Sequence, residues 1–151
     1  MILYLDTSAF VPLLVAEPTS AVCRRLWDDA DDVVSSVALR PEAASALWRA
    51  RHTGRITARQ QRTLVAAVAD LTEQMHLVVV DDPLSKAAAD LASAHGLRGY
   101  DAVHAATALT VVALEGLAAS GDPSLLAAWQ AAPIATCDIN AATSAPGDAA
   151  P

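Results

Sequence analysis

Four acidic residues stand where an apolar segment of the chain begins or ends. Asp101 starts a segment whose following residues are nearly all apolar or small, so its carboxylate is held at the edge of a core. That placement suits a metal ligand, although Asp101 taken alone could equally be an ordinary helix cap. Three other acids at similar edges favour a shared site. Asp6 closes the first apolar run, Glu42 opens an apolar helical segment, and Asp138 follows the last short apolar run.

Several other residues of chemical interest have simpler explanations. His104 lies one helical turn beyond the third acid and could reach the same site, but a lone histidine on a buried helix is more often a satisfied core residue. Asp81 and Asp82 also follow a strand-like run, yet Asp-Asp-Pro before a helix is typical of capping, and we interpret them as caps. Cys23 and Cys137 are too few and too far apart for a disulfide framework or a zinc site, so we expect reduced, buried thiols.

Short apolar runs are the first of the elements that must position these acids. Such runs are too short for helices and typical of buried strands, and they cover residues 2–5, 32–36, 77–80 and 134–136. Ligands bind at the carboxyl edge of open parallel sheets. Asp6, which ends the first run, is therefore well placed for function.

Helical segments lie between the expected strands. Pro41 must lie in the first turn of a helix, because further in it would clash with the preceding carbonyl group, so Glu42 is also near the helix start. Gly54 ends this helix, and Thr57 caps another that runs to about Gln74.

The C-terminal third contains an Ala-rich stretch that favours an accessory element. Residues 116–131 are interrupted by a Gly-Asp-Pro turn, and they predict an inserted helical hairpin that is not part of the catalytic fold. We expect residues 1–140 to form one domain that contains this insertion. Residues 141–151 are small, polar and Pro-containing, which predicts a mobile tail.

Charged residues are unevenly distributed along the chain. With 151 residues and 54% hydrophobic content the chain has the size of one domain, and its 10 basic and 17 acidic residues give a net charge of −7. That balance argues against a protein that binds nucleic acid mainly through phosphates. Five arginines nevertheless fall within 14 residues and predict a local basic corner: Arg49, Arg51, Arg55, Arg59 and Arg62. Together they could guide a nucleic acid to an otherwise acidic protein, although for any one of them a solvated helix face is the ordinary interpretation.

The N-terminus and the hydropathy pattern lead us to expect a cytoplasmic protein. Met1 leads into the first apolar run without a basic segment of the signal-peptide kind. No apolar stretch reaches the roughly 18 residues of a membrane span.

Four sequence segments together resemble a known family. In chain order they are Leu-Asp-Thr-Ser-Ala at 5–9, Glu-Ala-Ala-Ser-Ala-Leu at 42–47, Gly-Tyr-Asp-Ala-Val-His-Ala-Ala-Thr-Ala-Leu at 99–109 and Thr-Cys-Asp at 136–138. They are similar to the four acidic motifs of the PIN-domain ribonucleases, specifically the VapC-type toxins of bacterial toxin–antitoxin pairs. The resemblance implies an α/β fold with a parallel sheet sandwiched by helices. It also implies a homodimer, an inhibitory antitoxin, and endoribonuclease activity that depends on Mg²⁺ or Mn²⁺.

The resemblance also assigns roles to the four acids. Mg²⁺ takes oxygen ligands and keeps some of its water, so two or three carboxylates hold it and leave room for a phosphate. The metal can then activate a water molecule and stabilise charge at phosphorus. Asp6 and Asp101 are the expected direct ligands, with Glu42 and Asp138 completing the site directly or through water. The long gap between Asp101 and Asp138 is assigned to the insertion.

Two hydroxyl residues and one rival function complete the expectations. Ser8 and Thr136 could orient metal ligands, or they could be ordinary capping and strand-end hydroxyls. A catalytically silent PIN-like binding module is the alternative to a nuclease, because the same sheet edge could serve only as an interaction surface. A phosphohydrolase with an aspartyl nucleophile is disfavoured, since it would usually need a second acid at the position of Ser8.

Overall fold

The computed structural model describes residues 1–112 and 116–141, and its centre is a five-stranded sheet. The strands run in the order β3-β2-β1-β4-β5, and every neighbouring pair is parallel. Their bounds are Ile2–Leu5 for β1, Asp32–Ser36 for β2, His76–Val78 for β3, Gly116–Ser120 for β4 and Ala135–Asp138 for β5.

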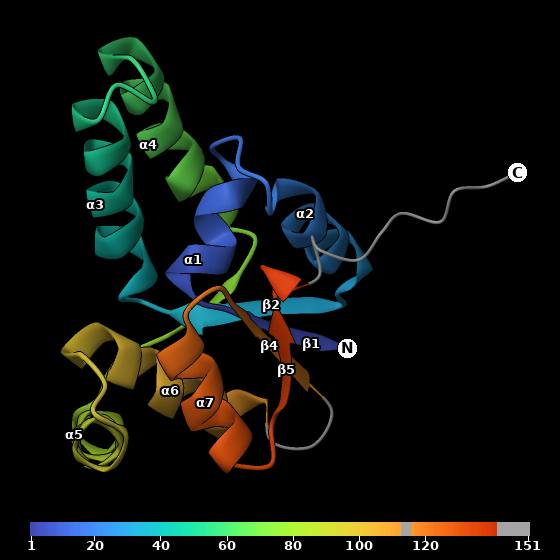
Figure 1. Ribbon diagram of the computed structural model, residues 1–151, viewed down its shortest axis with the longest axis vertical. Coiled ribbons are helices and arrows are strands. Elements are labelled where there is room, and N and C mark those ends of the chain that lie inside the picture. Colours follow the sequence, from blue (N-terminus) through green and yellow to red (C-terminus); the bar gives the residue numbers. More distant parts are fainter. Residues whose placement is uncertain (113–115, 142–151) are drawn as a thin grey trace, which may run out of the picture.

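Helices cover both faces of this sheet (Figure 1). One layer contains α1 (Thr7–Phe10), the 3₁₀ turn η1 (Val11–Leu13), α2 (Ser20–Asp29), α3 (Leu39–His52) and α4 (Ala58–Thr72). The other contains α5 (Asp82–His95), α6 (Gly99–Val111) and α7 (Pro123–Ala131). The expected α/β sandwich with a parallel sheet is confirmed.

Strand β1 is the middle of the sheet, and its side chains alternate between the two layers. Leu3 and Leu5 are fully buried in the core on the side of α1 to α4, whereas Tyr4 is fully buried in the core on the side of α5 to α7. This is the period of two that a strand imposes. Burying such a side chain contributes about 1.5–3 kcal/mol to stability. Asp6 follows directly, at the edge where β1 ends.

The predicted helical insertion at residues 116–131 is wrong. Residues 116–120 form β4, which pairs with β1 on one side and β5 on the other, and only α7 is helical. Alanine favours helices when propensity alone decides. Here Ala118 and Ala119 are fully buried, one in each core, so tertiary packing overrides propensity. Small residues are also needed, because a Cβ on Gly116 would lie 2.6 Å from Cγ1 of Val112.

Other expected boundaries agree with the structure more closely. Helix α3 carries Pro41 in its first turn, and Thr57 caps α4 through a capping box with Gln60. Asp81 is the N-cap of α5, as interpreted. Strand β3 stops at Val78, two residues earlier than expected.

Three further expectations concern the thiols, the chain end and the membrane. Cys23 is buried, Cys137 is only half-buried, and both are free thiols. The expected mobile tail lies outside the described residues except for residue 141. Within residues 1–112 and 116–141, we find no helix with the length and apolar character that crossing a bilayer requires.

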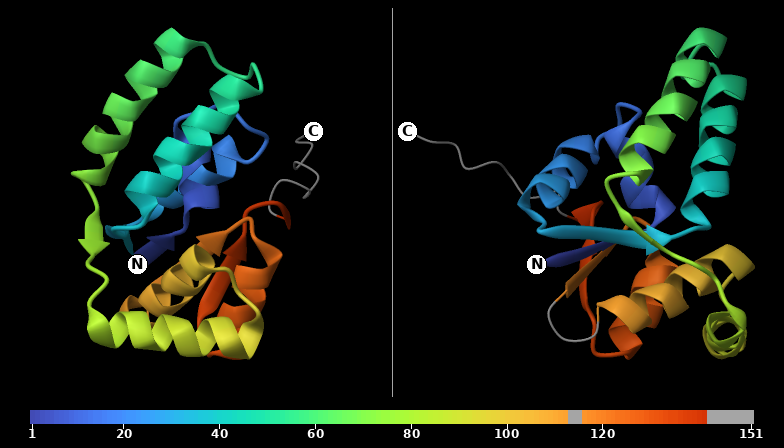
Figure 2. Two further views of the ribbon diagram at one scale, coloured as in Figure 1. Left: turned by 90° about the vertical axis from the view of Figure 1, so that its left-hand side faces the viewer. Right: turned by 180° about the vertical axis from the view of Figure 1, so that it is seen from behind.

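Helices α3 and α4 form an antiparallel hairpin that extends away from the sheet (Figure 2). The connection between them contains Gly54, whose φ of 75° is a left-handed conformation that favours glycine. One face of α3 lies over the carboxyl edge of the sheet, which places it beside Asp6.

Candidate active site

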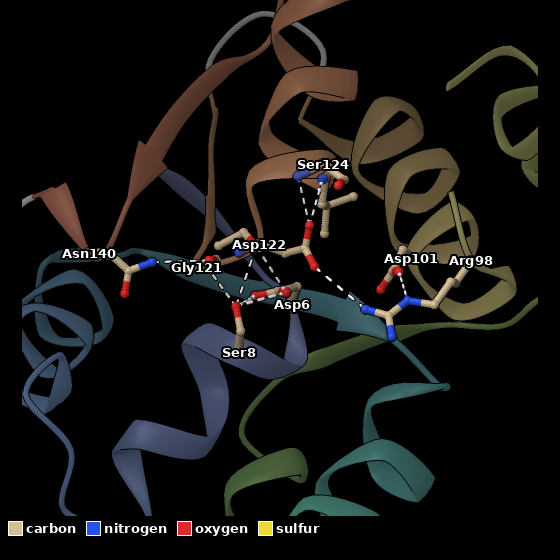
Figure 3. Close-up of polar contacts among 10 residues, drawn as sticks. Asp6, Ser8, Arg98, Asp101, Gly121, Asp122, Ser124 and Asn140 are labelled. Carbon is tan, nitrogen blue, oxygen red and sulfur yellow. Dashed lines mark hydrogen bonds and ion pairs between the residues drawn. The ribbon is translucent and has the colours of Figure 1, made fainter. Parts of the chain in front are cut away.

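A cleft of about 880 Å³ opens at the carboxyl edge of the sheet. Five carboxylates line it. Glu17 pairs with Arg55. The other four come from the ends of two adjacent strands and the first turns of two helices: Asp6, Glu42, Asp101 and Asp122. Three of these were expected from the sequence. Figure 3 shows the polar contacts of Asp6, Asp101 and Asp122.

Asp6 is 6% exposed and is surrounded by hydrogen-bond donors. Its Oδ1 accepts from the backbone N–H of Ala9 at 3.0 Å, which caps α1, and from the hydroxyl of Ser8 at 2.8 Å. Its Oδ2 accepts from the hydroxyl of Ser120 at 3.0 Å. Burial raises the pKa of Asp6, and nearby His104 and these hydrogen bonds only partly oppose the rise. A cation beside Asp6 would relieve that cost.

Glu42 is held by two donors on one oxygen. Its Oε2 accepts from the hydroxyl of Thr7 at 2.7 Å and lies 2.6 Å from Nε2 of His104. Burial acts to raise the pKa of Glu42, but the hydrogen bond and charge of His104 and the Thr7 hydroxyl lower it below its ordinary value. Glu42 is therefore an anion near neutral pH.

His104 is both a core residue and a neighbour of the site. It is 2% exposed, and its Nδ1 lies 2.7 Å from the hydroxyl of Tyr4 in the sheet. Both protonation states of the ring satisfy these contacts, since Nε2–H donates to Glu42 in each, and Nδ1 accepts from the Tyr4 hydroxyl in the neutral ring or donates to it in the charged ring. The sequence interpretation of a satisfied core histidine is confirmed, and its partner is the second acid of the site.

Asp101 occupies the first turn of α6 but does not cap it. The N-cap is Arg98, whose Nε donates to Oδ2 of Asp101 at 3.2 Å. The same guanidinium lies 4.0 Å from Oδ2 of Asp122. The side chain of Arg98 is largely exposed and lines the cleft. It connects Asp101 and Asp122 through these two ion pairs.

Asp122 is the acid that sequence reasoning missed as a site residue. It follows β4, and its Oδ1 caps α7 by accepting from the backbone N–H groups of Ser124 and Leu125 at 2.8 and 3.1 Å. Because β4 pairs with β1, Asp122 reaches the same edge as Asp6. A signal for Asp122 is present in the chain. Like Asp6, it lies between a strand and the start of a helix.

Asp138 does not reach the cleft. It ends the edge strand β5, its side chain is exposed, and Oδ1 accepts from the backbone N–H of Asn140 at 2.9 Å. The strand order explains this result, because β4 lies between β5 and β1. The unexpected strand β4 therefore supplies the fourth acid of the cleft in place of Asp138.

The two hydroxyl residues divide in the same way. Ser8 contacts both oxygens of Asp6, and its hydroxyl accepts from the backbone N–H of Gly121 at 2.7 Å. Thr136 lies on β5 and accepts from Gln130 at 3.4 Å, outside the cleft. Ser120 takes the place expected for Thr136, since its hydroxyl contacts Asp6 and accepts from the backbone N–H of Asp122.

Comparison with known proteins identifies the family. Residues 3–122 match the PIN domain, so the match covers most of the chain and ends on Asp122. The chain belongs to the PIN-domain family. This PIN-domain protein is 35% identical over 127 residues to Ribonuclease VapC45 of Mycobacterium tuberculosis, and the match covers 84% of this chain and 82% of the relative. The family resemblance expected from the acidic motifs is confirmed.

Solved structures share the fold of this PIN-domain protein. Mycobacterium tuberculosis VapC20, described as a sarcin-ricin loop cleaving toxin, has a TM-score of 0.65 at 20% identity and covers 83% of this chain and 94% of its own. VapBC-5 of the same organism, a member of the VapBC family of toxin-antitoxin systems, has a TM-score of 0.55 at 21% identity, with 90% and 95% covered.

The donor set of the PIN-domain cleft fits a hard divalent cation. Four carboxylates provide only oxygen ligands, which Mg²⁺ and Mn²⁺ accept. In the described part of the chain, however, no three acidic, histidine or cysteine side chains converge closely enough to hold an ion. Arg98 forms ion pairs with both Asp101 and Asp122, two of the carboxylates that would hold a cation. The oxygen donors therefore fit a divalent cation by their chemistry, and in this structure the guanidinium of Arg98 pairs with two of them.

The arginines predicted to form a basic corner lie on the α3–α4 hairpin, and two of the five line the cleft. Arg49 donates to the hydroxyl of Ser45 at 2.8 Å, and Arg55 pairs with Glu17 at 2.6 Å. Arg51 contacts Gln61 of α4. The other two, Arg59 and Arg62, are exposed on α4.

Proposed function

We propose that this PIN-domain protein is a metal-dependent endoribonuclease, the toxin of a toxin–antitoxin pair, which hydrolyses phosphodiester bonds in RNA. The observation that carries the proposal is the gathering of four carboxylates from β1, β4, α3 and α6 in one cleft. The similarity of the chain to a relative named as a ribonuclease supports the same activity. Mg²⁺ is the proposed cofactor, with Mn²⁺ as a substitute.

The four acids have different proposed roles, which follow from their surroundings. Asp6, Asp101 and Asp122 would hold the ion, which when bound activates water and stabilises negative charge at phosphorus. Both contacts of Glu42 fall on Oε2, so they leave Oε1 to a water molecule or the ion. Ser8 and Ser120 orient Asp6 through hydrogen bonds to its oxygens.

The proposed partners are a cognate antitoxin and a second copy of the chain. VapBC-5, which shares the fold, belongs to a toxin-antitoxin family. In such a pair an antitoxin would hold the nuclease inactive until it is released.

Cleavage of a panel of RNAs with Mg²⁺, with Mn²⁺ and with EDTA tests this function. We expect cleavage with either metal, none with EDTA, and none from Asp101→Asn, whose amide keeps the shape of the carboxylate but loses the charge. Full activity of Asp101→Asn or full activity in EDTA would contradict the metal site.

The alternative of a silent binding module has one observation in its favour. The ion pairs of Arg98 with Asp101 and Asp122 neutralise part of the acidic cleft without any metal. Thermal melts with and without Mn²⁺ separate the two functions, because a nuclease site is stabilised by the ion and a silent surface is not.

A further inference from the structure

Trp48 is the most exposed tryptophan of the described chain and stands near the end of α3. Its side chain is 54% exposed, whereas Trp129 is fully buried and Trp27 is half-buried. The ring of His52 stacks on it with the centroids 4.9 Å apart and the planes 9° apart. The i and i+4 spacing places both rings on one side of the helix. A flat aromatic stack is thus held in open solvent.

A hollow of about 320 Å³ lies at this stack and is lined by Trp48, Arg51 and His52. Nη1 of Arg51 donates to Oε1 of Gln61 on α4 at 3.2 Å, which ties the guanidinium to the second helix of the hairpin. The hollow therefore joins planar ring faces to a fixed cation. That combination matches a nucleobase with its phosphate, because bases stack on aromatic rings and phosphates pair with guanidinium groups.

Charge on the hairpin also selects a polyanion. Residues 43–69 contain five arginines and no aspartate or glutamate, although the chain as a whole has a net charge of −7. Half of the ten cations of the protein therefore lie in this segment of the α3–α4 hairpin, which carries Trp48 on α3. A single-stranded RNA would meet a favourable potential here and an unfavourable one over much of the remaining surface.

The stack adjoins the cleft along α3. Ser45 and Arg49 line the cleft, and Trp48 and His52 each lie three residues further along the same helix. At 100° per residue, the two rings occupy the helix side next to the cleft-facing side. A single-stranded RNA that left the cleft along α3 would pass over the two rings.

We propose that Trp48, His52 and Arg51 form a subsite in which an unpaired base of single-stranded RNA stacks beside the cleft. The subsite rests on the proposed ribonuclease function, because it positions the same substrate. Stacking on a ring is available to every base, so the subsite adds affinity without selecting a sequence.

Equilibrium binding tests the subsite in a background that cannot cleave. The parent protein is Asp101→Asn in EDTA, and the probes are a short fluorescein-labelled single-stranded RNA of mixed sequence and an abasic ribose-phosphate oligomer of the same length. Trp48→Ala should weaken RNA binding by about 5- to 150-fold, the range that corresponds to about 1–3 kcal/mol for one stacked base. Trp48→Phe keeps a ring and should retain most of the affinity.

Two controls isolate the stacking. Val65→Ala removes exposed apolar surface from α4 of the same hairpin and should leave the RNA affinity unchanged. The abasic oligomer keeps the phosphates without the bases, so the parent and Trp48→Ala should bind it equally. Arg51→Gln should instead lower the salt dependence of binding to both probes.

The outcomes distinguish this subsite from the function on which it rests. If the parent binds no RNA and the wild type cleaves none, the ribonuclease function and the subsite fall together. If the parent binds RNA and Trp48→Ala binds it equally, the subsite alone is overturned. A change in molecular mass of Trp48→Ala by light scattering, with RNA affinity unchanged, would assign the stack to an interface between copies instead.

Discussion

Each carboxylate of the cleft has its own set of protein partners, and these partners distinguish the four acids. Asp6 has hydroxyl and amide donors, Glu42 has a histidine, and Asp101 and Asp122 share one guanidinium. The sequence predicted Asp6, Glu42 and Asp101 because each stands at the boundary of an apolar segment. The sequence did not reveal Asp122 as a site residue, because an Asp before Pro is typical of an ordinary helix cap. Asp122 is indeed the N-cap of α7.

Substitution of the fourth acid separates the two aspartates that compete for this role. Asp122→Asn should lower metal-dependent cleavage by about 100-fold or more, because charge stabilisation by a bound ion is worth several kcal/mol. Asparagine still caps a helix, so the melting temperature should change little. Asp138→Asn is the matched control and should change the rate by less than about twofold, as for a surface position. The reverse ranking of the two variants would return Asp138 to the site.

The stability of the metal-free protein should depend on pH through Asp6. Its folded-state pKa lies above the ordinary value of 3.8, so the ionised carboxylate destabilises the fold. This cost is absent below pH 3.8, grows as the pH rises from there to the folded-state pKa, and is complete above it. In EDTA, Asp6→Asn should therefore unfold at higher urea concentration than the wild type at neutral pH, and the gain should shrink as the solution is acidified. A gain of equal size at neutral and acidic pH would exclude the charge as its cause.

At the level of elements, the sequence located β1, β2, β5 and the helices well but misassigned β4. Apolar runs with β-branched residues announce buried strands, and caps and prolines mark helix starts. The run Gly-Leu-Ala-Ala-Ser of residues 116–120 has no β-branched residue, and only its place between β1 and β5 makes it a strand. That error also misplaced the fourth acid, because the strand order decides which carboxyl end adjoins Asp6.

Single substitutions can verify that residues 116–131 belong to the fold. Ala118→Asp places an unpaired charge at a fully buried position of β4 and should unfold the protein at room temperature, with a cost of roughly 3–5 kcal/mol or more. Ala127→Asp changes an exposed position of α7 and should cost less than about 1 kcal/mol. Circular dichroism melts of both variants provide the measurement. Equal tolerance of the two changes would support an accessory hairpin after all.

At the scale of the whole molecule, an acidic body carries a basic helical hairpin beside its cleft. The net charge of −7 alone disfavours an RNA-binding protein, but the arginines at 49, 51, 55, 59 and 62 are gathered on α3, α4 and the turn between them. The average charge of a chain cannot report this separation. Only the fold shows that Arg49 and Arg55 line the same cleft as the carboxylates.

RNA binding should therefore depend on where a charge is removed. Replacing Arg49 and Arg55 together by glutamine should weaken binding of single-stranded RNA and reduce the salt slope by about 0.7 for each phosphate that the protein no longer neutralises. Replacing Arg24 and Arg25 on α2 changes the net charge by the same amount and should leave the slope unaltered. Titrations at several salt concentrations give the comparison, and equal slopes for the two double variants would make the hairpin arginines a solvated face.

The pairing of β1 with β4 joins residues 2–5 to residues 116–119, so one of the two neighbours of the first strand lies more than a hundred residues later in the chain. During translation the ribosome must have made Asp122 before the four acids can meet. A growing chain that stops short of residue 122 thus carries Asp6, Glu42 and Asp101 without the fourth carboxylate of the proposed site. The order of the strands therefore keeps the proposed nuclease site unassembled until residue 122 has been made.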